Sequence, residues 1–393
     1  EVFVHMLTFN REISQLQPSK SMTFMAKAKQ LQAVDPEVIN LAGGEPDFDT
    51  PQKIRDEMFR WVSQGYTHYT VGPGLPELRE RIARKLAEEN SCSYSPEGIV
   101  VTPGGKFAIY LAVRSLVNPG DEVMYLEPGW VSYPSIIEAS AATPVPVRLP
   151  LATNYKITLE QLEQFVTEKT KMLIINYPNN PTGKVLSREE ADAIEQFLLN
   201  HPDLVLLADE IYERIVYTGY ENISMASYPS IASRVITVNG FSKSVAMTGW
   251  RIGYLATTPV IKTVMYKLFQ HTMSCVSGFI QKAAVVALAC TQEIEDMRRQ
   301  YERRRDLFVG GLNAIDGVTC SYPEGAFYAW VKFDIPGLDS EGVCDRILNQ
   351  AKVVGVPGIA YGTDDSCVRF SFAASDEELK KAVEQIRRMM EQI

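Results

Sequence analysis

A lysine and an arginine eight residues apart lie in surroundings that are unusual for surface charges. Lys243 directly follows a predicted strand, and Arg251 is flanked by Trp250 and Ile252. Charged side chains are rarely buried unless they are paired, so apolar neighbours indicate a function for these charges. The segment 239–253 is therefore the most informative part of the sequence for a functional site.

A second segment has the pattern of an anion site. In Thr102-Pro-Gly-Gly-Lys-Phe107 a predicted strand stops, two glycines turn the chain, and a helix begins. The backbone N–H groups and the helix N-terminus at such a turn favour a phosphate. On this segment alone, a tight turn with a solvent-exposed lysine is an equally good interpretation.

Two further polar positions follow predicted buried strands. Asn180 lies in Asn176-Tyr-Pro-Asn-Asn-Pro-Thr-Gly183, after a strand whose carboxyl end is expected to open onto a ligand crevice. Asn and Pro also occur in ordinary turns. Asp209 follows the apolar run 204–208 and precedes Tyr212 by three residues. A buried carboxylate is costly without a cation or good hydrogen bonds, so we expect Asp209 to have a partner.

These positions are held by alternating strands and helices. The predicted strands before Cys290 are 99–102, 122–125, 171–176, 204–208, 235–238 and 252–255. Helices are predicted over 107–116 and, after a capping box of Ser187 and Glu190, through Leu199. Strands that are apolar almost throughout belong in a sheet covered on both faces. The sequence therefore predicts an α/β fold with a mostly parallel sheet.

The character of the chain changes after about Cys290. A long charged helix over 292–312 precedes strand-like pieces at 319–322, 327–333 and 367–372 and a last helix over 376–392. This order predicts a second, smaller α+β domain. The predicted domains are an N-terminal arm with part of the small domain (1–49), a large domain (50–289) and a small C-terminal domain (290–393).

The composition argues against some classes of partner. The 393 residues carry a formal net charge of -9 without a block of Lys or Arg, which argues against nucleic acid and anionic membranes. No apolar run approaches the roughly 20 residues of a membrane-spanning helix. The six cysteines lack zinc or redox spacing, which favours reduced thiols in a cytoplasmic protein. No metal site is predicted, because the histidines are single and scattered (His5, His68, His201, His271).

Together these motifs resemble the fold-type I pyridoxal-phosphate enzymes, and among them the class I aminotransferases of the bacterial and thermophile aspartate aminotransferase subgroup. The resemblance rests on the ordered occurrence of Asn-Pro-Thr-Gly (180–183), Asp209 with Tyr212, and Ser-Lys (242–243) with Gly-Trp-Arg (249–251). It covers nearly the whole chain, from about residue 41 to 372. It implies a mostly parallel, seven-stranded sheet sandwiched by helices, with a smaller α+β domain.

The resemblance implies pyridoxal 5′-phosphate as the cofactor, with Lys243, Asp209 and Tyr212 as catalytic residues. Lys243 would carry the cofactor aldehyde as a Schiff base, which requires a free amine and a pKa lowered near the cofactor and Arg251. Asp209 would keep the pyridine nitrogen protonated, so that the ring accepts electrons from the substrate Cα. Asn180 and Tyr212 would hydrogen-bond the phenolic oxygen of the ring.

Further residues match positions around the cofactor phosphate in this family. Arg251 matches the arginine that pairs with the phosphate, and the neighbouring cofactor residues are Gly104, Gly105, Lys106 and Ser242. At the position three before Lys243, many relatives have a serine that also contacts phosphate. This chain has glycine there, so one phosphate contact is expected to be missing.

The resemblance also implies one residue that stacks on the cofactor ring and one that reaches into the neighbouring subunit. Trp130 matches the aromatic residue that stacks on the cofactor ring. Tyr69 matches the tyrosine that reaches the cofactor phosphate of the neighbouring subunit. The resemblance therefore implies a homodimer with shared active sites.

The resemblance also implies which residues bind the substrate. Arg369 would bind the α-carboxylate bidentately, and Gly44 would lie where the backbone approaches the substrate. Trp130 and Asn180 are expected to contact the substrate as well. Lys106 matches a lysine that serves the distal carboxylate in this subgroup.

The reaction implied is ping-pong transamination. An amino acid displaces Lys243 from the cofactor, and the freed amine moves a proton away from the substrate Cα. A 2-oxo acid leaves, and a second 2-oxo acid then takes up the amino group. We expect aspartate or a related amino acid as the donor and 2-oxoglutarate as the acceptor.

Other substrates and one other reaction stay open. The segment 270–277 lacks the arginine that relatives from animals and enteric bacteria place on the distal carboxylate, so dicarboxylate specificity does not follow automatically. Aromatic, alanine and prephenate aminotransferases carry the same residues. A C–S lyase of the same fold shares the lysine but releases pyruvate or ammonia without a keto-acid acceptor, which one assay separates.

Overall fold

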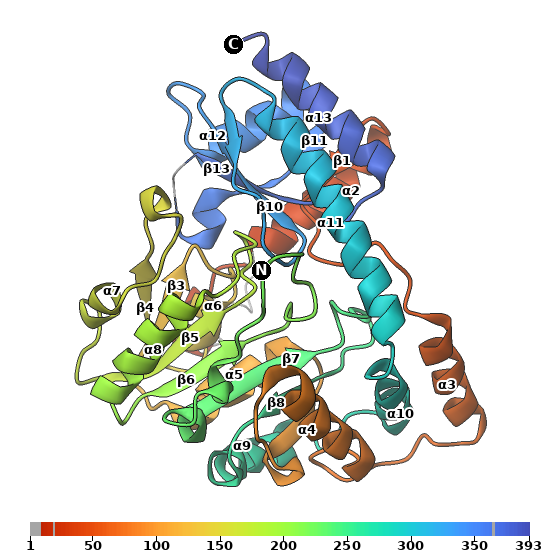
Figure 1. The fold of residues 1–393 in the computed structure, drawn as a ribbon, viewed down its shortest axis with the longest axis vertical. Coiled ribbons are helices and arrows are strands. Elements are labelled where there is room, and N and C mark those ends of the chain that lie inside the picture. The colour runs from red at the N-terminus through yellow and green to blue at the C-terminus, as the bar shows by residue number, and fades with distance from the viewer. Residues whose placement is uncertain (1–8, 19, 364–365) are drawn as a thin grey trace, which may run out of the picture.

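The computed structural model describes residues 9–18, 20–363 and 366–393. The described chain contains a seven-stranded sheet and a four-stranded sheet, which lie one above the other in Figure 1. Apolar cores lie on both faces of the larger sheet and at the smaller sheet, and polar side chains meet where the two parts face each other. This arrangement places the functional residues between the two sheets.

The larger sheet has the strand order β2-β8-β7-β6-β5-β3-β4. Its strands are β2 (Ile99–Thr102), β3 (Glu122–Glu127), β4 (Thr143–Arg148), β5 (Thr170–Asn176), β6 (Val205–Asp209), β7 (Val235–Gly240) and β8 (Gly253–Ala256). The five strands from β7 to β4 run parallel, and β8 is antiparallel to both neighbours. The predicted α/β fold with a mostly parallel sheet is confirmed.

Helices cover both faces of this sheet because successive side chains on its strands point to opposite sides. In β5, Leu173 and Ile175 belong to one apolar core, while Met172 and Ile174 belong to the other. The first core includes residues of α3 (Gln52–Ser63), α4 (Pro76–Asn90), α8 (Arg188–Asn200) and α10 (Gly278–Ala287). The second includes residues of α5 (Gly105–Leu116), α6 (Tyr133–Glu138) and α9 (Pro259–Thr272).

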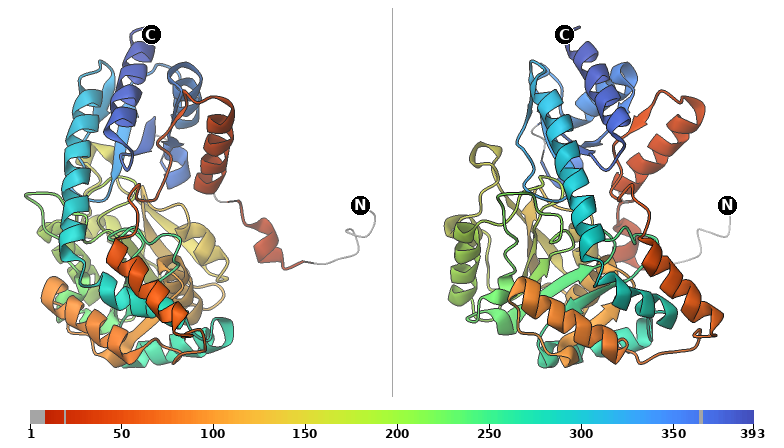
Figure 2. Two further views of the ribbon diagram at one scale, coloured as in Figure 1. Left: turned by 90° about the vertical axis from the view of Figure 1, so that its right-hand side faces the viewer. Right: turned by 45° about the vertical axis from the view of Figure 1, so that its right-hand side comes forward.

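The smaller sheet is antiparallel with the order β12-β13-β10-β9. Its strands are β9 (Val318–Cys320), β10 (Tyr328–Phe333), β12 (Val356–Pro357) and β13 (Cys367–Ser371). The helices α11 (Thr291–Asn313), α12 (Ser340–Arg346) and α13 (Asp376–Met390) complete this part. Figure 2 shows α11, in cyan, extending from the larger part to the smaller one.

The N-terminal segment joins the C-terminal third of the chain. It contains α1 (Arg11–Gln15), α2 (Lys20–Val34) and β1 (Ile39–Asn40). Strand β1 pairs in parallel with β11 (Val353–Val354). The predicted domain boundaries at 49/50 and 289/290 stay a prediction, and residues 1–8 of the predicted arm lie outside the described residues.

The predicted strands are present, and the capping box at Ser187 and Glu190 begins α8 as expected. In the larger sheet one strand was missed, because β4 reads Thr-Pro-Val-Pro-Val-Arg and proline cannot donate to a strand ladder. The two-residue strands β1, β11 and β12 were missed as well. Strand β4 lies at the edge of the sheet, where such prolines are tolerated. Among the described residues no helix is long and apolar enough to cross a membrane.

Candidate active site

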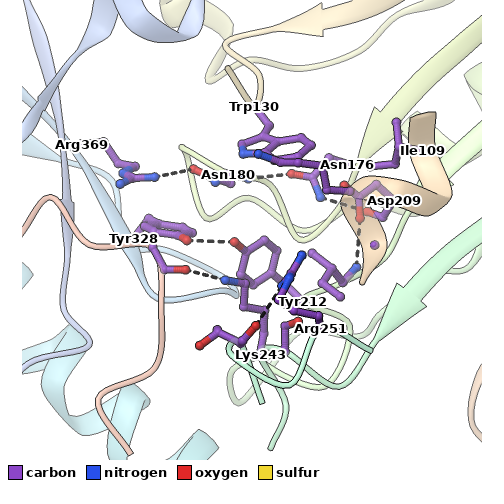
Figure 3. Close-up of a pocket in the computed structure, with 16 residues that line it drawn as sticks. Ile109, Trp130, Asn176, Asn180, Asp209, Tyr212, Lys243, Arg251, Tyr328 and Arg369 are labelled. Carbon is purple, nitrogen blue, oxygen red and sulfur yellow. Dashed lines mark hydrogen bonds between the residues drawn. The ribbon is translucent and has the colours of Figure 1, made fainter. Parts of the chain in front are cut away.

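A cavity of about 280 Å³ opens at the carboxyl ends of β5 and β6 and faces the smaller sheet. Figure 3 shows the labelled side chains of both sheets converging on it. Its lining consists of Gly44, Gly105, Lys106, Ile109, Trp130, Asn176, Asn180, Asp209, Ile211, Tyr212, Ser242, Lys243, Thr248, Arg251, Tyr328 and Arg369. Carboxyl ends of parallel strands are the usual ligand crevice of such sheets.

The cavity gathers all but two of the residues predicted for the site. Gly104 lies directly beside it, and a side chain at this position would come within 2.7 Å of the Arg251 guanidinium. Tyr69 does not line the cavity, and its side chain is 91% exposed. The structure thus brings the predicted residues together, while the role of each stays a prediction.

Lys243 follows β7 and reaches into the cavity, where its amine donates a hydrogen bond to the carbonyl oxygen of Gly44. Burial of the amine lowers the Lys243 pKa to about 8, opposed by the nearby carboxylate of Glu45 and assisted by Arg369 and Arg251. The expectation of a lowered pKa had named the cofactor and Arg251 as causes. In the structure, loss of hydration is the largest cause and Arg251 is a lesser one.

Asp209 ends β6, and its carboxyl group is buried in the cavity. The hydroxyl of Tyr133 donates to Asp209 Oδ2 at 2.8 Å, and the backbone N–H of Ile211 donates to Oδ1 at 3.4 Å. Burial outweighs both hydrogen bonds and raises the Asp209 pKa to about 6. The partner expected from the sequence is therefore largely a tyrosine that the sequence analysis did not identify.

Asn176 fixes the turn that carries Asn180. The Asn176 side chain donates to the carbonyl oxygen of Asp209 at 2.9 Å and accepts from the backbone N–H of Asn180 at the same distance. In the sequence, Asn176 is marked only as the first residue of a motif. Its two hydrogen bonds join the ends of β5 and β6, so that Asn180 and Asp209 enter the cavity from fixed positions.

Arg369 enters from β13 and is almost fully buried. Its guanidinium donates to Asn180 Oδ1 at 3.1 Å and to the carbonyl oxygen of Ala42 at 2.7 Å. The Arg369 Nε has no hydrogen-bond partner among the described residues. A buried guanidinium with a spare donor beside the cavity fits a carboxylate ligand.

Tyr212 and Tyr328 meet across the two sheets. Tyr212 follows β6, Tyr328 begins β10, and their hydroxyl oxygens are 2.8 Å apart. Sequence reasoning missed Tyr328, because an aromatic residue in an apolar strand carries no signal that separates it from the core. Only its tertiary position, on the cavity wall, marks it.

Two cations and a glycine turn form the other end of the cavity. Arg251 has a φ of 52°, uncommon for a residue with a side chain, and its guanidinium donates to the carbonyl oxygen of Thr248 at 2.8 Å. Lys106 lies in the first turn of α5 with its amine 4.9 Å from the centre of the Trp130 ring. Burial and, after it, Arg251 lower the Lys106 pKa. A helix N-terminus beside two cations fits a phosphate group.

The side chains that line the cavity therefore fit each end of pyridoxal phosphate. An amine of lowered pKa suits the aldehyde, a buried carboxyl suits a cationic ring nitrogen, and the Arg251 end suits the phosphate. At Gly104 the φ of 86° favours glycine, and a side chain there would displace the Arg251 guanidinium. Within residues 9–18, 20–363 and 366–393, no three His, Cys, Asp or Glu residues gather as metal ligands; His5 lies outside that part.

Known proteins share this sequence and fold. The family described as Aminotransferase class I and II matches residues 36–386. An aspartate aminotransferase from Geobacillus stearothermophilus is 39% identical over 388 residues, covering 97% of this chain and 98% of that protein. A probable aspartate/prephenate aminotransferase from Aquifex aeolicus is also 39% identical, with the same coverage. The solved aspartate aminotransferase from Thermus thermophilus with maleate has a TM-score of 0.92 and 36% identity, covering 98% of this chain and 100% of that one.

Proposed function

The chain belongs to the class I and II aminotransferases, and we propose that it transfers the amino group of aspartate, or of a closely related amino acid, to 2-oxoglutarate. It is a pyridoxal-phosphate-dependent enzyme that acts on amino acids and 2-oxo acids. The observation that carries the proposal is that Lys243, Asp209 and Arg369 line one cavity.

When bound, pyridoxal phosphate supplies an aldehyde that condenses with amines and a ring that accepts the electron pair left on the substrate Cα. Lys243 is the residue that would hold the aldehyde end. Arg251, with the backbone of Gly104 and Gly105 at the start of α5, would hold the phosphate. Asp209 would face the ring nitrogen, where a positive charge stabilises its buried carboxylate.

The substrate would be oriented by Arg369. Its spare Nε and its Nη groups can bind both oxygens of an α-carboxylate, which fixes the amino acid relative to Lys243. With a pKa of about 8, the Lys243 amine is partly neutral near neutral pH, and far more so than an ordinary lysine with a pKa of 10.5. It would take the proton from the substrate Cα and deliver it to the cofactor carbon that carries the aldehyde group, acting first as base and then as acid.

The choice of aspartate rests on Lys106 and on the relatives. Lys106 lies at the same cavity as Arg369 and can meet a second carboxylate. Matching relatives include proteins named aspartate aminotransferase from Geobacillus stearothermophilus and Musicola paradisiaca. Other relatives are named aspartate/prephenate aminotransferase, so prephenate is the first alternative acceptor to test. Aromatic amino acids, alanine and a C–S lyase reaction complete the alternatives.

Lys106→Ala tests the substrate proposal. We expect kcat/KM for aspartate to fall by roughly tenfold or more, while kcat/KM for alanine changes little, because alanine lacks the distal carboxylate. Lys262→Ala is a matched control, since the Lys262 amine also lies over an aromatic ring, 4.6 Å from the centre of Tyr266, but outside the cavity. Unchanged aspartate turnover in Lys106→Ala would remove Lys106 from this role.

The assembly and location are part of the same proposal. A homodimer with shared active sites would give Tyr69 a partner, and the nearby Val71 and Phe59 are also exposed. A cytoplasmic location is supported by the cysteines, since the described residues include all six and contain no disulfide. The domain division at residues 49 and 289 is proposed on the pairing of β1 with β11.

A further inference from the structure

Tyr328 lies on the cavity wall and contacts both Tyr212 and Arg369. Its hydroxyl oxygen is 2.8 Å from that of Tyr212, as the dashed line in Figure 3 shows. The Arg369 guanidinium carbon lies 4.4 Å from the centre of the Tyr328 ring. A side chain at Gly44 would come within 3.4 Å of the Tyr328 hydroxyl. Tyr328 thus stands between the arginine of the smaller sheet and the tyrosine of the larger one.

The charge of Arg369 distinguishes the two hydroxyl groups. Burial raises the pKa of both tyrosines. Arg369 lies against the Tyr328 ring and is the first influence that opposes this rise at Tyr328, whereas at Tyr212 it comes after the effects of the Tyr328 hydroxyl. At Tyr212 the nearby Asp209 also acts to raise the pKa. Because the Arg369 cation lies 4.4 Å from the centre of the Tyr328 ring, it favours negative charge on the Tyr328 oxygen, which makes the Tyr328 hydroxyl the better donor of the two.

We propose that Tyr328 is a positioning residue that donates its hydroxyl proton to the oxygen of Tyr212, so that Tyr212 directs its own proton into the cavity. The two residues are 116 positions apart in the sequence: Tyr212 follows β6 of the larger sheet, and Tyr328 begins β10 of the smaller one. Donors and acceptors in such a chain polarise one another, so each hydrogen bond strengthens the next. Arg369, Tyr328 and Tyr212 then form one chain from the substrate carboxylate to the cofactor.

This inference rests on the proposed function and on the role that the family resemblance implies for Tyr212, in which its hydroxyl hydrogen-bonds the phenolic oxygen of the cofactor. Without the Tyr328 hydroxyl, the Tyr212 oxygen loses its donor and the Tyr212 proton becomes a weaker partner for that phenolic oxygen. The negative charge on the phenolic oxygen is then less stabilised. The cofactor bound to Lys243 consequently keeps its proton to a higher pH.

Tyr328→Phe is the direct test, because it removes only the hydroxyl and keeps the ring under Arg369. The measurement is the pH midpoint of the visible absorbance change of the holoenzyme. We expect this midpoint to rise by about 0.5 to 1 pH unit, the size expected for one neutral hydrogen bond. Tyr361→Phe is the matched control, since the Tyr361 ring lies 5.3 Å from Arg369 and its buried hydroxyl has no hydrogen-bond partner among the described residues.

A double variant tests whether Tyr328 acts through Tyr212. In the Tyr212→Phe background, Tyr328→Phe is expected to leave the midpoint unchanged. Replacing Tyr328 by 3-fluorotyrosine, whose hydroxyl is more acidic, is expected to lower the midpoint, and it tests the proposal even if Tyr328→Phe folds poorly.

Four results would overturn the proposal. These are an unshifted or lowered midpoint in Tyr328→Phe, an equal shift in Tyr361→Phe, a full shift in the Tyr212→Phe background, and a midpoint with 3-fluorotyrosine that does not fall. A wild-type protein without any visible absorbance band would instead contradict the proposed function. The failures of the two proposals are therefore distinguishable.

Discussion

The Tyr133 hydroxyl donates a 2.8 Å hydrogen bond to Asp209 Oδ2, although the two residues are 76 positions apart. Both side chains are buried, and burial raises the Asp209 pKa to about 6 in spite of this bond. The folded protein therefore holds a carboxyl group that is poorly stabilised when it ionises. A cation in the cavity, such as a protonated ring nitrogen, would supply the missing stabilisation.

Asp209→Asn should therefore stabilise the cofactor-free protein. Between pH 3.8, the ordinary Asp value, and about pH 6, the folded chain holds a proton that the unfolded chain has lost. The free energy of unfolding of the wild type consequently falls as the pH rises through this window. At pH 8 we expect the variant to gain on the order of 1 to 3 kcal/mol, with a higher Tm in thermal unfolding.

The gain in Asp209→Asn should shrink as the pH is lowered toward 4, because the folded carboxyl is then protonated and the unfolded one begins to take up its proton as the pH approaches 3.8. Asp316→Asn, at an exposed position, is the control and should show no such trend. The variant should also bind pyridoxal phosphate more weakly. A Tm at pH 8 below that of the wild type would show that ionised Asp209 is well stabilised without the cofactor.

Arg369→Lys should weaken substrate binding more than a change between two cations suggests. A lysine cannot reproduce the planar pair of donors, and hydrogen bonds to charged groups contribute roughly 1.5 to 3 kcal/mol. We expect kcat/KM to fall by about 10- to 150-fold for amino acids and 2-oxo acids alike. Steady-state kinetics beside Arg299→Lys, an exposed arginine on α11, measures this; equal kinetics of the two variants would exclude the proposed role.

A buried polar cluster beside the turn that carries Tyr212 should control stability. Lys85 of α4 donates to Glu213 and to Asn90 at 2.8 Å, and Glu213 follows Tyr212 directly. Burial raises the pKa of the neighbouring Glu210 to about 8, and the charge of Glu213 adds to this effect. Lys85→Met leaves Glu213 without its buried cation, so we expect a loss of about 3 to 5 kcal/mol in the free energy of unfolding.

Chemical denaturation measures this loss in the free energy of unfolding and compares it with the loss of an exposed ion pair. Lys156→Met removes the exposed partner of Glu189 and should lower the free energy of unfolding by less than about 1 kcal/mol. Adding Glu213→Gln to Lys85→Met should recover part of the loss, because the unpaired charge is gone. Equal losses in Lys85→Met and Lys156→Met would show that the cluster is not effectively buried.

Most of the fold could be predicted from the sequence, because the patterns that indicate its strands and helices are local. Apolar strand runs, the capping box at Ser187 and the glycine turn before α5 act over a few residues, and the structure has each of them. Strand β4 was missed because its prolines disfavour strands except at a sheet edge. Knowing that it lies at the edge requires the topology of the whole sheet.

Within the site, the residues that sequence patterns found were those in motifs. Asn180, Asp209 and Lys243 follow predicted strands, and the structure places all of them at one cavity. Tyr133 and Tyr328 were not found, because their partners lie 76 and 116 positions away and nothing near them in the sequence differs from core. Tertiary packing alone gives these hydroxyl groups their partners.

Mixing two inactive variants tests whether the active sites are shared. If Tyr69 serves the partner subunit, a mixed dimer of Tyr69→Ala and Lys243→Ala has one site with both changes and one with neither. Random mixing should then restore about a quarter of the wild-type sites. Activity after refolding the mixture should exceed the average of the separate variants, and activity equal to that average would place Tyr69 in its own subunit's site or outside any site.

The role of Lys243 is tested most directly by linking the cofactor irreversibly to the residue that binds it. The purified protein is loaded with pyridoxal phosphate, reduced with borohydride, digested and analysed by mass spectrometry, beside the Lys243→Ala variant. We expect the phosphopyridoxyl mass on the peptide that contains Lys243, and transamination by Lys243→Ala to be nearly absent. A label on another lysine, or an alanine variant that transaminates at the wild-type rate, would contradict the account.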